Sequence, residues 1–432
     1  MNRDWRQVTL EEVSDQITVG HVGSMASRYV EIGIPFLRSQ NVKRLQLDLS
    51  ETKFIPESFH AELQKSRLRP GDVVIVRTGE PGSCAVIPDT LPDSNCSDLV
   101  IVRPGSELDA RFLSYYVNAA AQHHVASHLV GAVQQHFNVG AARTLPLNLP
   151  PFFEQLAIVG VLGALDDKIE QNRRTAEGLE KLARAIFRAW FVDFEPVHAK
   201  AAGATSFPGM PPAVFDSLPT RLVDSELGPI PEGWGVERLS TICEVNPKRA
   251  IRKGDVAPYL DMKGMPTSGH APSDWIDRPF GSGMRFINGD TLVARITPCL
   301  ENGKTAYVDF LEPDQVAWGS TEYIVLRPLD PNPPIFAYCL ARTDEFRDFA
   351  VQNMSGTSGR QRVPAEAMDH YRLANPSRSC AEAFGKIVEP LFARVRAGID
   401  ESRKLAELRD YLLPKLLSGE VRVNPTADEE AA

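Results

Sequence analysis

Two segments of the chain carry apolar residues at the same spacing and in the same phase. The positions step by alternating threes and fours, and adding 226 to each position of the first segment gives the second. Such spacing is typical of helices that pair along a coiled-coil seam. The first seam is Leu162, Leu165, Ile169, Asn172, Ala176, Leu179, Ala183, Ile186 and Trp190, and the second is Val388, Leu391, Val395, Gly398, Ser402, Leu405, Arg409, Leu412 and Leu416. We infer an internal duplication in which a long helix closes each copy.

Short motifs before each helix occur in the same order in both copies. A tryptophan comes first, then a Pro-aromatic-Leu segment, a turn into a mainly apolar strand, and a second apolar strand that ends in Arg-Pro. These are Trp5, 35–37, 69–78 and 100–104 in the first copy, and Trp234, 258–260, 288–297 and 324–328 in the second. The offset between matched motifs varies from 218 to 229. The copies therefore share a frame and differ in their loops.

Composition limits the class of protein. At 432 residues the chain exceeds what one hydrophobic core usually supports, so at least two domains are expected. No apolar run approaches the roughly 18 residues of a membrane helix, and the chain does not begin like a signal peptide, so we expect a cytoplasmic protein. The six cysteines include no Cys-x-x-Cys pair, which favours buried reduced thiols. The net charge of -9 alone disfavours a nucleic-acid partner, although clustered basic residues can outweigh it.

The pattern predicts a mixed α/β (α+β) fold with two duplicated globular domains, each followed by a long helix. Pro150 and Pro151 favour a helix start, and Ser418-Gly419 favours a helix end. The expected parts are a first domain (1–150), a helix (151–196), an unpacked linker rich in Ala, Gly and Pro (197–232), a second domain (233–375), a helix (376–420) and a mobile acidic tail (421–432).

Known catalytic and metal-binding motifs are incomplete. Gly303-Lys304-Thr305 lacks the upstream glycine of a phosphate loop. Asn332-Pro333-Pro334 lacks the aromatic residue that follows in amino-methyltransferases. The histidines at 123, 124 and 128 could share a helix face but have no companion ligands. We expect neither a catalytic site nor a metal site.

Polar loops recur at matched positions of the two copies. Arg, Gln, Asn and Lys side chains match the edges of bases, and Ser and Thr suit phosphates, so these loops are candidate DNA contacts. The alternative is that they are ordinary solvated loops. The candidates are Arg38, Gln40, Asn41, Arg77, Thr78, Gln134, Gln135 and His136 in the first copy, and Lys263, Arg295, Thr297, Ser358, Arg360 and Arg362 in the second.

Several strings resemble the specificity subunit of type I restriction-modification enzymes. They cover almost the whole chain, and those in the long helices are the most specific. The strings are GIPFLR (33–38), LRPGD (68–72), LPP with EQ (149–155), IEQNRR (169–174), AIF with WFVDF (185–194), LAELRD (405–410) and LLPKL (412–416).

This resemblance implies two target-recognition domains joined by two antiparallel helices that act as a spacer. Each domain would read one half of a bipartite site in double-stranded DNA. Two methyltransferase subunits would dock on the helices, and motor-nuclease restriction subunits would join for cleavage. S-adenosylmethionine, ATP and Mg would then be bound by those partners, with no cofactor and no catalysis in this chain.

The resemblance also assigns seam and docking residues. We expect Leu408 to replace Arg409 at the helix interface, and partner subunits to cover an exposed aromatic end of the first helix. The assigned residues are Leu162, Leu165, Ile169, Leu179, Ile186, Trp190, Phe191, Leu391, Val395, Leu405, Leu412 and Leu416.

Two other classes of function remain open. A scaffold protein could combine a coiled coil with two peptide-binding domains, and a self-sufficient methyltransferase would need its own cofactor pocket. DNA binding that weakens steeply with salt would separate the first class from a DNA-reading subunit.

Overall fold

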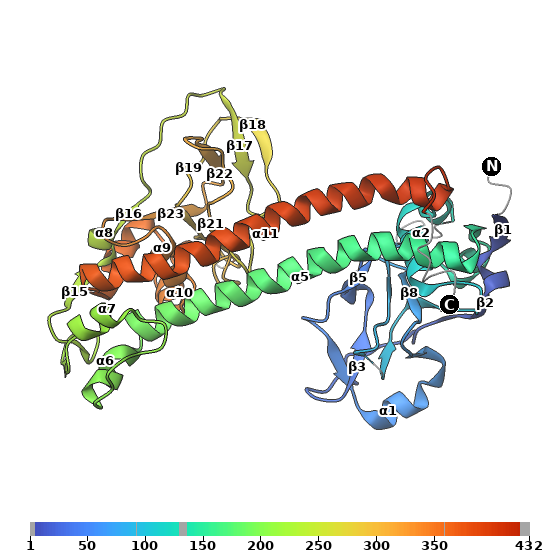
Figure 1. The fold of residues 1–432 in the computed structure, drawn as a ribbon, viewed down its shortest axis with the longest axis horizontal. Helices are drawn as coiled ribbons and strands as arrows, with labels where there is room; N and C mark the ends of the chain where they lie inside the picture. Colours follow the sequence, from blue (N-terminus) through green and yellow to red (C-terminus); the bar gives the residue numbers. More distant parts are fainter. Residues whose placement is uncertain (1–4, 92, 129–135, 358, 424–432) are drawn as a thin grey trace. The chain divides into compact units, whose positions relative to one another are not determined.

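A computed structural model describes residues 5–91, 93–128, 136–357 and 359–423. The chain divides into two compact units (Figure 1). Unit 1 consists of Met1–Ile169 and Arg403–Ala432, and unit 2 of Glu170–Ser402. Each unit therefore combines one globular domain with one end of each long helix.

The described residues of unit 1 form two four-stranded sheets and two pairs of short strands. One sheet has the order β2 (Ser14–Val19), β11 (Leu99–Pro104), β8 (Val73–Val76), β9 (Cys84–Val86), and the other β6 (Lys53–Ile55), β3 (Ile34–Leu37), β10 (Ser94–Cys96), β7 (Arg67–Leu68). The pairs are β1 (Arg6–Thr9) with β12 (Pro146–Leu149), and β4 (Val42–Lys43) with β5 (Gln46–Leu47). The short helices are α1 (Glu57–Glu62), α2 (Ala110–Ala119), α3 (Gln122–Ser127) and α4 (Val139–Arg143).

Unit 2 repeats the two four-stranded sheets. Its sheets have the orders β16 (Cys243–Val245), β23 (Tyr323–Pro328), β20 (Thr291–Ala294), β21 (Thr305–Tyr307) and β18 (Ile276–Pro279), β17 (Val256–Leu260), β22 (Ala317–Gly319), β19 (Met284–Phe286). The pairs are β15 (Gly235–Arg238) with β24 (Arg372–Asn375), and β13 (Leu222–Val223) with β14 (Ile230–Pro231). Its short helices are α6 (Glu195–Ala201), α7 (Pro212–Ser217), α8 (Leu239–Ile242), α9 (Ile335–Ala341) and α10 (Asp344–Gln352).

The strand register confirms the internal duplication. β8 and β11 pair with Val76 opposite Leu99, and β20 and β23 pair with Ala294 opposite Tyr323. The turn before each inner strand has a glycine at positive φ, 84° at Gly71 and 86° at Gly289. Glycine adopts this conformation without the steric cost that a Cβ atom brings. Both copies thus enter the buried strand through the same type of turn.

The apolar run 73–76 forms a strand buried on both faces. Val73 and Ile75 belong to one hydrophobic cluster, and Val74 and Val76 to another. Because successive side chains of a strand point to opposite faces, a strand between two cores needs apolar residues at every position. This explains why the sequence shows a continuous run here instead of an alternation.

The two long helices are α5 (Phe152–Phe191) and α11 (Arg378–Ser418), and α11 continues through Pro390 without interruption. Every seam residue proposed from the sequence is buried or half-buried. The helices run antiparallel in each unit, since Asp166 meets Arg409 in unit 1 and Phe187 meets Phe384 in unit 2. Among the described residues, no helix has the length and apolar character needed to cross a membrane.

The expected replacement of Arg409 by Leu408 is wrong. Leu408 is 45% exposed, while the Arg409 side chain is 17% exposed and donates through Nη1 to Asp166 Oδ1 at 2.7 Å. A carboxylate on the facing helix therefore provides the counter-charge that an arginine in a seam requires.

A second polar contact crosses the helix seam at Gly398 of α11. Asn172 is 4% exposed and donates to the Gly398 carbonyl oxygen at 3.3 Å and to Glu401 Oε2 at 2.8 Å. A Cβ atom on Gly398 would lie 3.7 Å from the Asn172 side chain, which is an ordinary van der Waals contact. The buried Asn172 amide is satisfied by acceptors on the facing helix.

Two other expectations are corrected by the core of unit 2. Trp190 and Phe191 are 3% and 7% exposed, so the aromatic end of α5 is already covered within its own unit. The supposed linker 197–232 contains α6 and α7, and its residues Val197, Met210, Phe215 and Leu218 belong to the same core. The apolar residues of this segment are spaced irregularly between prolines, so the sequence shows neither a helical nor a strand period there. In the structure these residues nevertheless pack against the helices.

The cysteines are free thiols in the structure. Five are buried, whereas Cys299 is partly exposed. Burial raises the pKa of Cys84 and of Cys243 to about 12, which keeps both thiols protonated and unreactive.

Candidate nucleic-acid interface

The predicted polar residues after the inner strand form a matched arrangement in both domains. Arg77, directly after β8, pairs with Asp98, and its carbonyl oxygen accepts a hydrogen bond from Phe137 N at 3.0 Å. Arg295, directly after β20, has Nε 3.7 Å from Glu322 Oε2, and its carbonyl oxygen accepts from Val363 N at 2.9 Å. We call each pair, Arg77 with Asp98 and Arg295 with Glu322, an arginine–carboxylate corner.

The first corner gathers two further predicted residues. The Thr78 hydroxyl lies 2.7 Å from His136 Nδ1, and which atom donates depends on the histidine tautomer. The Thr78 hydroxyl is also 3.5 Å from Asp98 Oδ2. Asp98 has a φ of 26°, a strained value for a residue with a side chain. The structure thus brings Arg77, Thr78 and His136 together.

The second corner has different neighbours around the same pair. Arg362 binds Glu322 through Nε at 2.9 Å and Nη2 at 2.8 Å. Thr297 accepts a hydrogen bond from Gln361 N at 3.1 Å through its hydroxyl oxygen. The Nε atom of Arg295 is buried without a hydrogen-bond partner among the described residues. Arg295, Thr297 and Arg362 therefore lie in one cluster.

The carboxylates of both corners were not among the residues predicted from the sequence. Asp98 and Glu322 each stand directly before the long central strand of their domain, β11 or β23. An acidic residue at the same place in both copies was the signal that could have found them. Each carboxylate holds its arginine at the end of the inner strand.

The other predicted contacts lie outside these corners. Gln40, Lys263 and Arg360 are exposed. Asn41 is only 1% exposed. Its Oδ1 accepts a hydrogen bond from Arg38 N at 3.0 Å, and its Nδ2 donates to the Asp48 carbonyl oxygen at 2.9 Å. The proposal of Asn41 as a DNA contact is therefore corrected, since its amide shapes the loop.

Arg38 lies half-buried in the same loop. Its Nη2 donates to the Glu51 carbonyl oxygen at 2.7 Å. Its guanidinium carbon lies 6.0 Å from the centre of the Tyr29 ring. Three further candidates, Gln134, Gln135 and Ser358, lie outside the described residues.

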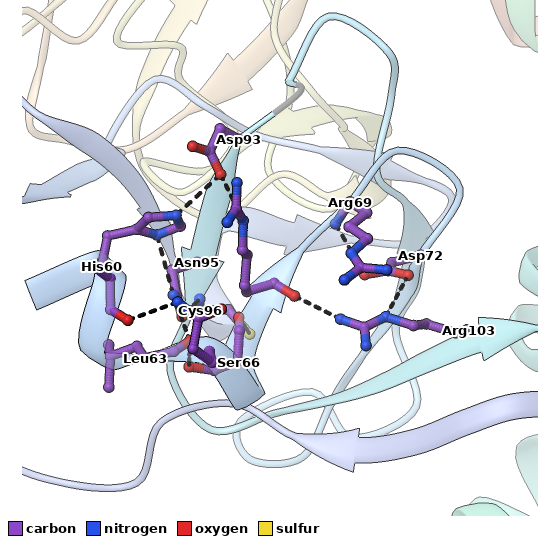
Figure 2. A network of polar contacts seen from close by, with 12 residues as sticks. His60, Leu63, Ser66, Arg69, Asp72, Asp93, Asn95, Cys96 and Arg103 are labelled. Atoms are coloured by element: carbon purple, nitrogen blue, oxygen red, sulfur yellow. Dashed lines mark hydrogen bonds and ion pairs between the residues drawn. The ribbon is translucent and has the colours of Figure 1, made fainter. Parts of the chain in front are cut away.

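A buried aspartate stabilises the turn before β8, at the opposite end of that strand from the corner of unit 1. Asp72 accepts hydrogen bonds from Arg69 N at 3.0 Å and Arg103 Nε at 3.2 Å (Figure 2). Burial raises the pKa of Asp72, and the bonds from Arg69 and Arg103 oppose that rise. Arg103 also donates through Nη2 to the Arg67 carbonyl at 2.8 Å, and Arg67 Nε lies 3.1 Å from Asp93. The network links the turn before β8 to β7 and β11.

Unit 2 has the equivalent aspartate. Asp290 is fully buried and accepts from Ile287 N at 2.8 Å, with Arg327 Nε at 2.7 Å and Arg249 Nη2 at 3.1 Å. Burial raises its pKa as well, against the hydrogen bond from Ile287 N and the charges of Arg327 and Arg249. Because the Asp–Arg pair recurs in both domains, it belongs to the shared frame.

His60 extends the network in unit 1. Its Nε2 lies 3.1 Å from Asp93 Oδ1, and its Nδ1 lies 3.3 Å from Asn95 Nδ2 (Figure 2). Asn95 is fully buried on β10 and also donates to the Leu63 carbonyl at 3.1 Å. These contacts join α1 to the second sheet. We assign them to the frame.

A basic loop in unit 2 was not singled out from the sequence. Lys248, Arg252 and Lys253 are exposed, and their side chains have no acidic partner among the described residues. Arg278 is exposed on β18, 4.9 Å above the Tyr259 ring. In a chain of net charge -9, such a cluster is a candidate phosphate contact. We call Lys248, Arg252 and Lys253 the basic loop.

Among the described residues, no group of three or more His, Cys, Asp or Glu side chains is placed to hold a metal ion.

Comparison with known proteins identifies relatives along the full chain. No family model matches. The type I restriction enzyme HindI specificity subunit of Haemophilus influenzae is 22% identical over 469 aligned positions, covering 97% of this chain and all of that protein. The MjaIX specificity subunit of Methanocaldococcus jannaschii is 29% identical over 280 positions, covering 62% of this chain and 59% of that protein. 

A solved structure agrees in fold. The S subunit of a type I restriction-modification system from M. genitalium aligns with a TM-score of 0.55 and 15% identity over 96% of this chain and 97% of that one. This chain is therefore similar along its full length to type I restriction-modification specificity subunits, and it shares the fold of one such S subunit of known structure.

Proposed function

We propose that this chain is the sequence-specific DNA-binding subunit of a type I restriction-modification system, with each domain reading one half of a bipartite site. The observation that carries the proposal is the repeated frame with unlike loops. Both domains have an arginine–carboxylate corner, but the side chain beside it is His136 in one and Arg362 in the other. A shared frame with different polar side chains suits two readers of different base sequences.

The exposed polar residues are the best candidates for base contacts. Gln40, Lys263 and Arg360 are exposed, so their side chains would be able to reach a groove of DNA. Arg77 and Arg295 are held by carboxylates and would contact DNA in a fixed orientation. A bidentate arginine or glutamine contact discriminates between bases by about 1–3 kcal/mol.

The long helices would set the gap between half-sites and dock two methyltransferase subunits. A helix of 40 residues such as α5 is about 60 Å long at 1.5 Å per residue. Restriction subunits would join that complex. The chain itself would be non-catalytic, and S-adenosylmethionine, ATP and Mg would be bound by the partner subunits.

Methylation mapping tests the proposed reading. The chain is co-expressed with its methyltransferase subunit, and methylated adenines are located in genomic DNA. We expect one bipartite motif with a fixed gap. An Arg360→Ala variant should relax base preference in one half only, by about 5- to 150-fold for a contact of 1–3 kcal/mol. Gln40→Ala is the matched variant for the other half, and equal relaxation of both halves by Arg360→Ala would contradict independent reading.

A salt titration tests the basic loop. Neutralising Lys248, Arg252 and Lys253 with glutamine should lower the slope of log K against log salt by about 3, near 0.9 for each phosphate contact. The recognised motif should stay the same, because phosphate contacts carry no base information. The control carries glutamine at the exposed helix lysines Lys181, Lys386 and Lys404. Binding that does not depend on salt in the unmodified complex would favour the scaffold alternative.

A further inference from the structure

A tyrosine fixes the domain of unit 1 to both long helices. Tyr115 lies on α2 and is 3% exposed. Its hydroxyl donates to Asp166 Oδ2 on α5 at 2.5 Å. The other oxygen of Asp166 accepts from Arg409 Nη1 on α11 at 2.7 Å. One carboxylate thus joins the domain, α5 and α11.

Unit 2 makes an equivalent connection with other residues. Tyr338 on α9 is fully buried, and its hydroxyl donates to Glu180 Oε1 on α5 at 2.6 Å. Glu180 Oε2 lies 3.4 Å from His270 Nδ1, and His270 Nε2 lies 3.0 Å from Asp309. Asp309 lies 3.8 Å from Arg396 on α11. The domain, α5 and α11 are again joined through a carboxylate on α5.

The two tyrosines occupy the same place in the domain plan. Each lies on the helix that follows the long central strand, α2 after β11 and α9 after β23. That strand begins directly after the corner carboxylate, Asp98 or Glu322. A short covalent path therefore runs from the candidate reading corner to the tyrosine, and from its hydroxyl to α5.

Hydrogen bonds to a carboxylate supply the directionality that apolar packing lacks. The hydrophobic effect is non-directional, so the surrounding apolar cores alone tolerate small rotations of a domain on the helices. A hydroxyl–carboxylate bond is short and directional, and it is among the stronger hydrogen bonds in proteins. A bond of this kind restricts the angle between domain and helix.

We propose that Tyr115 and Tyr338 are positioning residues, each of which fixes the orientation of its domain on the helices and thereby the gap at which the two half-sites are read. The assignment rests on the proposed function. It concerns the gap length and leaves the identity of the bases to the loops.

Phenylalanine substitutions test it, with neighbouring tyrosines as controls. Tyr115→Phe and Tyr338→Phe remove the hydroxyls. Tyr116 is also buried on α2, but its hydroxyl accepts from Asn148 N at 3.3 Å inside the domain. Tyr323 is buried on β23, and its hydroxyl donates to the Leu260 carbonyl at 3.2 Å, also inside the domain. Tyr116→Phe and Tyr323→Phe are therefore the matched controls.

The readout is the ratio of methylation rates on duplexes with the native gap and with a gap changed by one base pair. We expect Tyr115→Phe and Tyr338→Phe to lower this ratio about tenfold, the lower end of the effect of a charge-assisted hydrogen bond. The control variants should retain the wild-type ratio of methylation rates even if they are less stable. A merely structural role would lower all rates together and leave the ratio unchanged.

The ratio of methylation rates supports or overturns the positioning role of Tyr115 and Tyr338. An unchanged ratio in both variants, or an equal drop in the controls, overturns it while leaving the bipartite motif intact. A wild-type complex that methylates no bipartite motif overturns the proposed function and this assignment with it. If Tyr115→Phe does not fold, Asp166→Asn removes the charge of the acceptor, and the same drop in the ratio is expected.

Discussion

Replacing Trp190 with alanine is expected to lower the free energy of unfolding of unit 2 by about 3–5 kcal/mol, as large aromatic truncations in cores do. Trp190 is 3% exposed in the core that includes Phe191 and Phe384. Its ring centre lies 6.1 Å from that of Phe191 and 6.3 Å from that of Phe384. Denaturant unfolding followed by fluorescence or circular dichroism would measure the loss.

Leu182→Ala is the control on the same helix. Leu182 is 48% exposed, so its truncation should change the free energy of unfolding by about 0.5 kcal/mol or less. The comparison also decides between two roles for the aromatic end of α5. A loss below about 1 kcal/mol in Trp190→Ala, with loss of methyltransferase binding, would restore the docking role expected from the sequence.

The stability of unit 2 is expected to fall as pH rises from 6.5 to about 9. Burial disfavours the charged form of His270, but hydrogen bonds to Asp309 and Glu180 outweigh it and raise the pKa of His270 to about 9 from 6.5. A histidine with a raised folded-state pKa stabilises the fold fully below its unfolded pKa, and the contribution disappears above the folded pKa. The shift corresponds to roughly 3 kcal/mol.

At acidic pH the stability of unit 2 depends on pH with the opposite sign. Burial alone would raise the pKa of Glu180, but hydrogen bonds from His270 and Tyr338 lower it below 4.5. Its contribution is therefore present above pH 4.5 and lost as pH falls through the lowered pKa. Denaturant unfolding at a series of pH values would measure both limbs. His270→Gln should flatten the decline between pH 6.5 and 9, and the exposed His123→Gln should not. An equal decline in His270→Gln and wild type would contradict the charged His270.

The frame of each domain could be predicted because its signals are local. The run 73–76 and its counterpart 291–294 are read from four consecutive residues, and both are buried strands. The heptad-like seams predicted the two long helices, and their shared phase indicated the duplication. In the candidate site, Arg77 and Arg295 were found because they directly follow those strands.

The partners of the polar residues could not be predicted, because they are distant in the sequence. Arg409 looks unsuited to a seam until Asp166 is placed opposite it, 243 residues away. Asn172 likewise needs the Gly398 carbonyl oxygen, and the corner arginines need Asp98 and Glu322.

The sequence by itself determined the duplicated order of strands and the two amphipathic helices, because local periodicity decides which side chains share a face. Only the tertiary structure decided which polar residues are buried in the helix seam and which apolar residues remain exposed to solvent. Trp190 is covered by its own unit, and Arg409 is neutralised within its own unit. Burial and charge compensation depend on residues that folding brings together, and the sequence of one segment does not specify which distant residue will contact it.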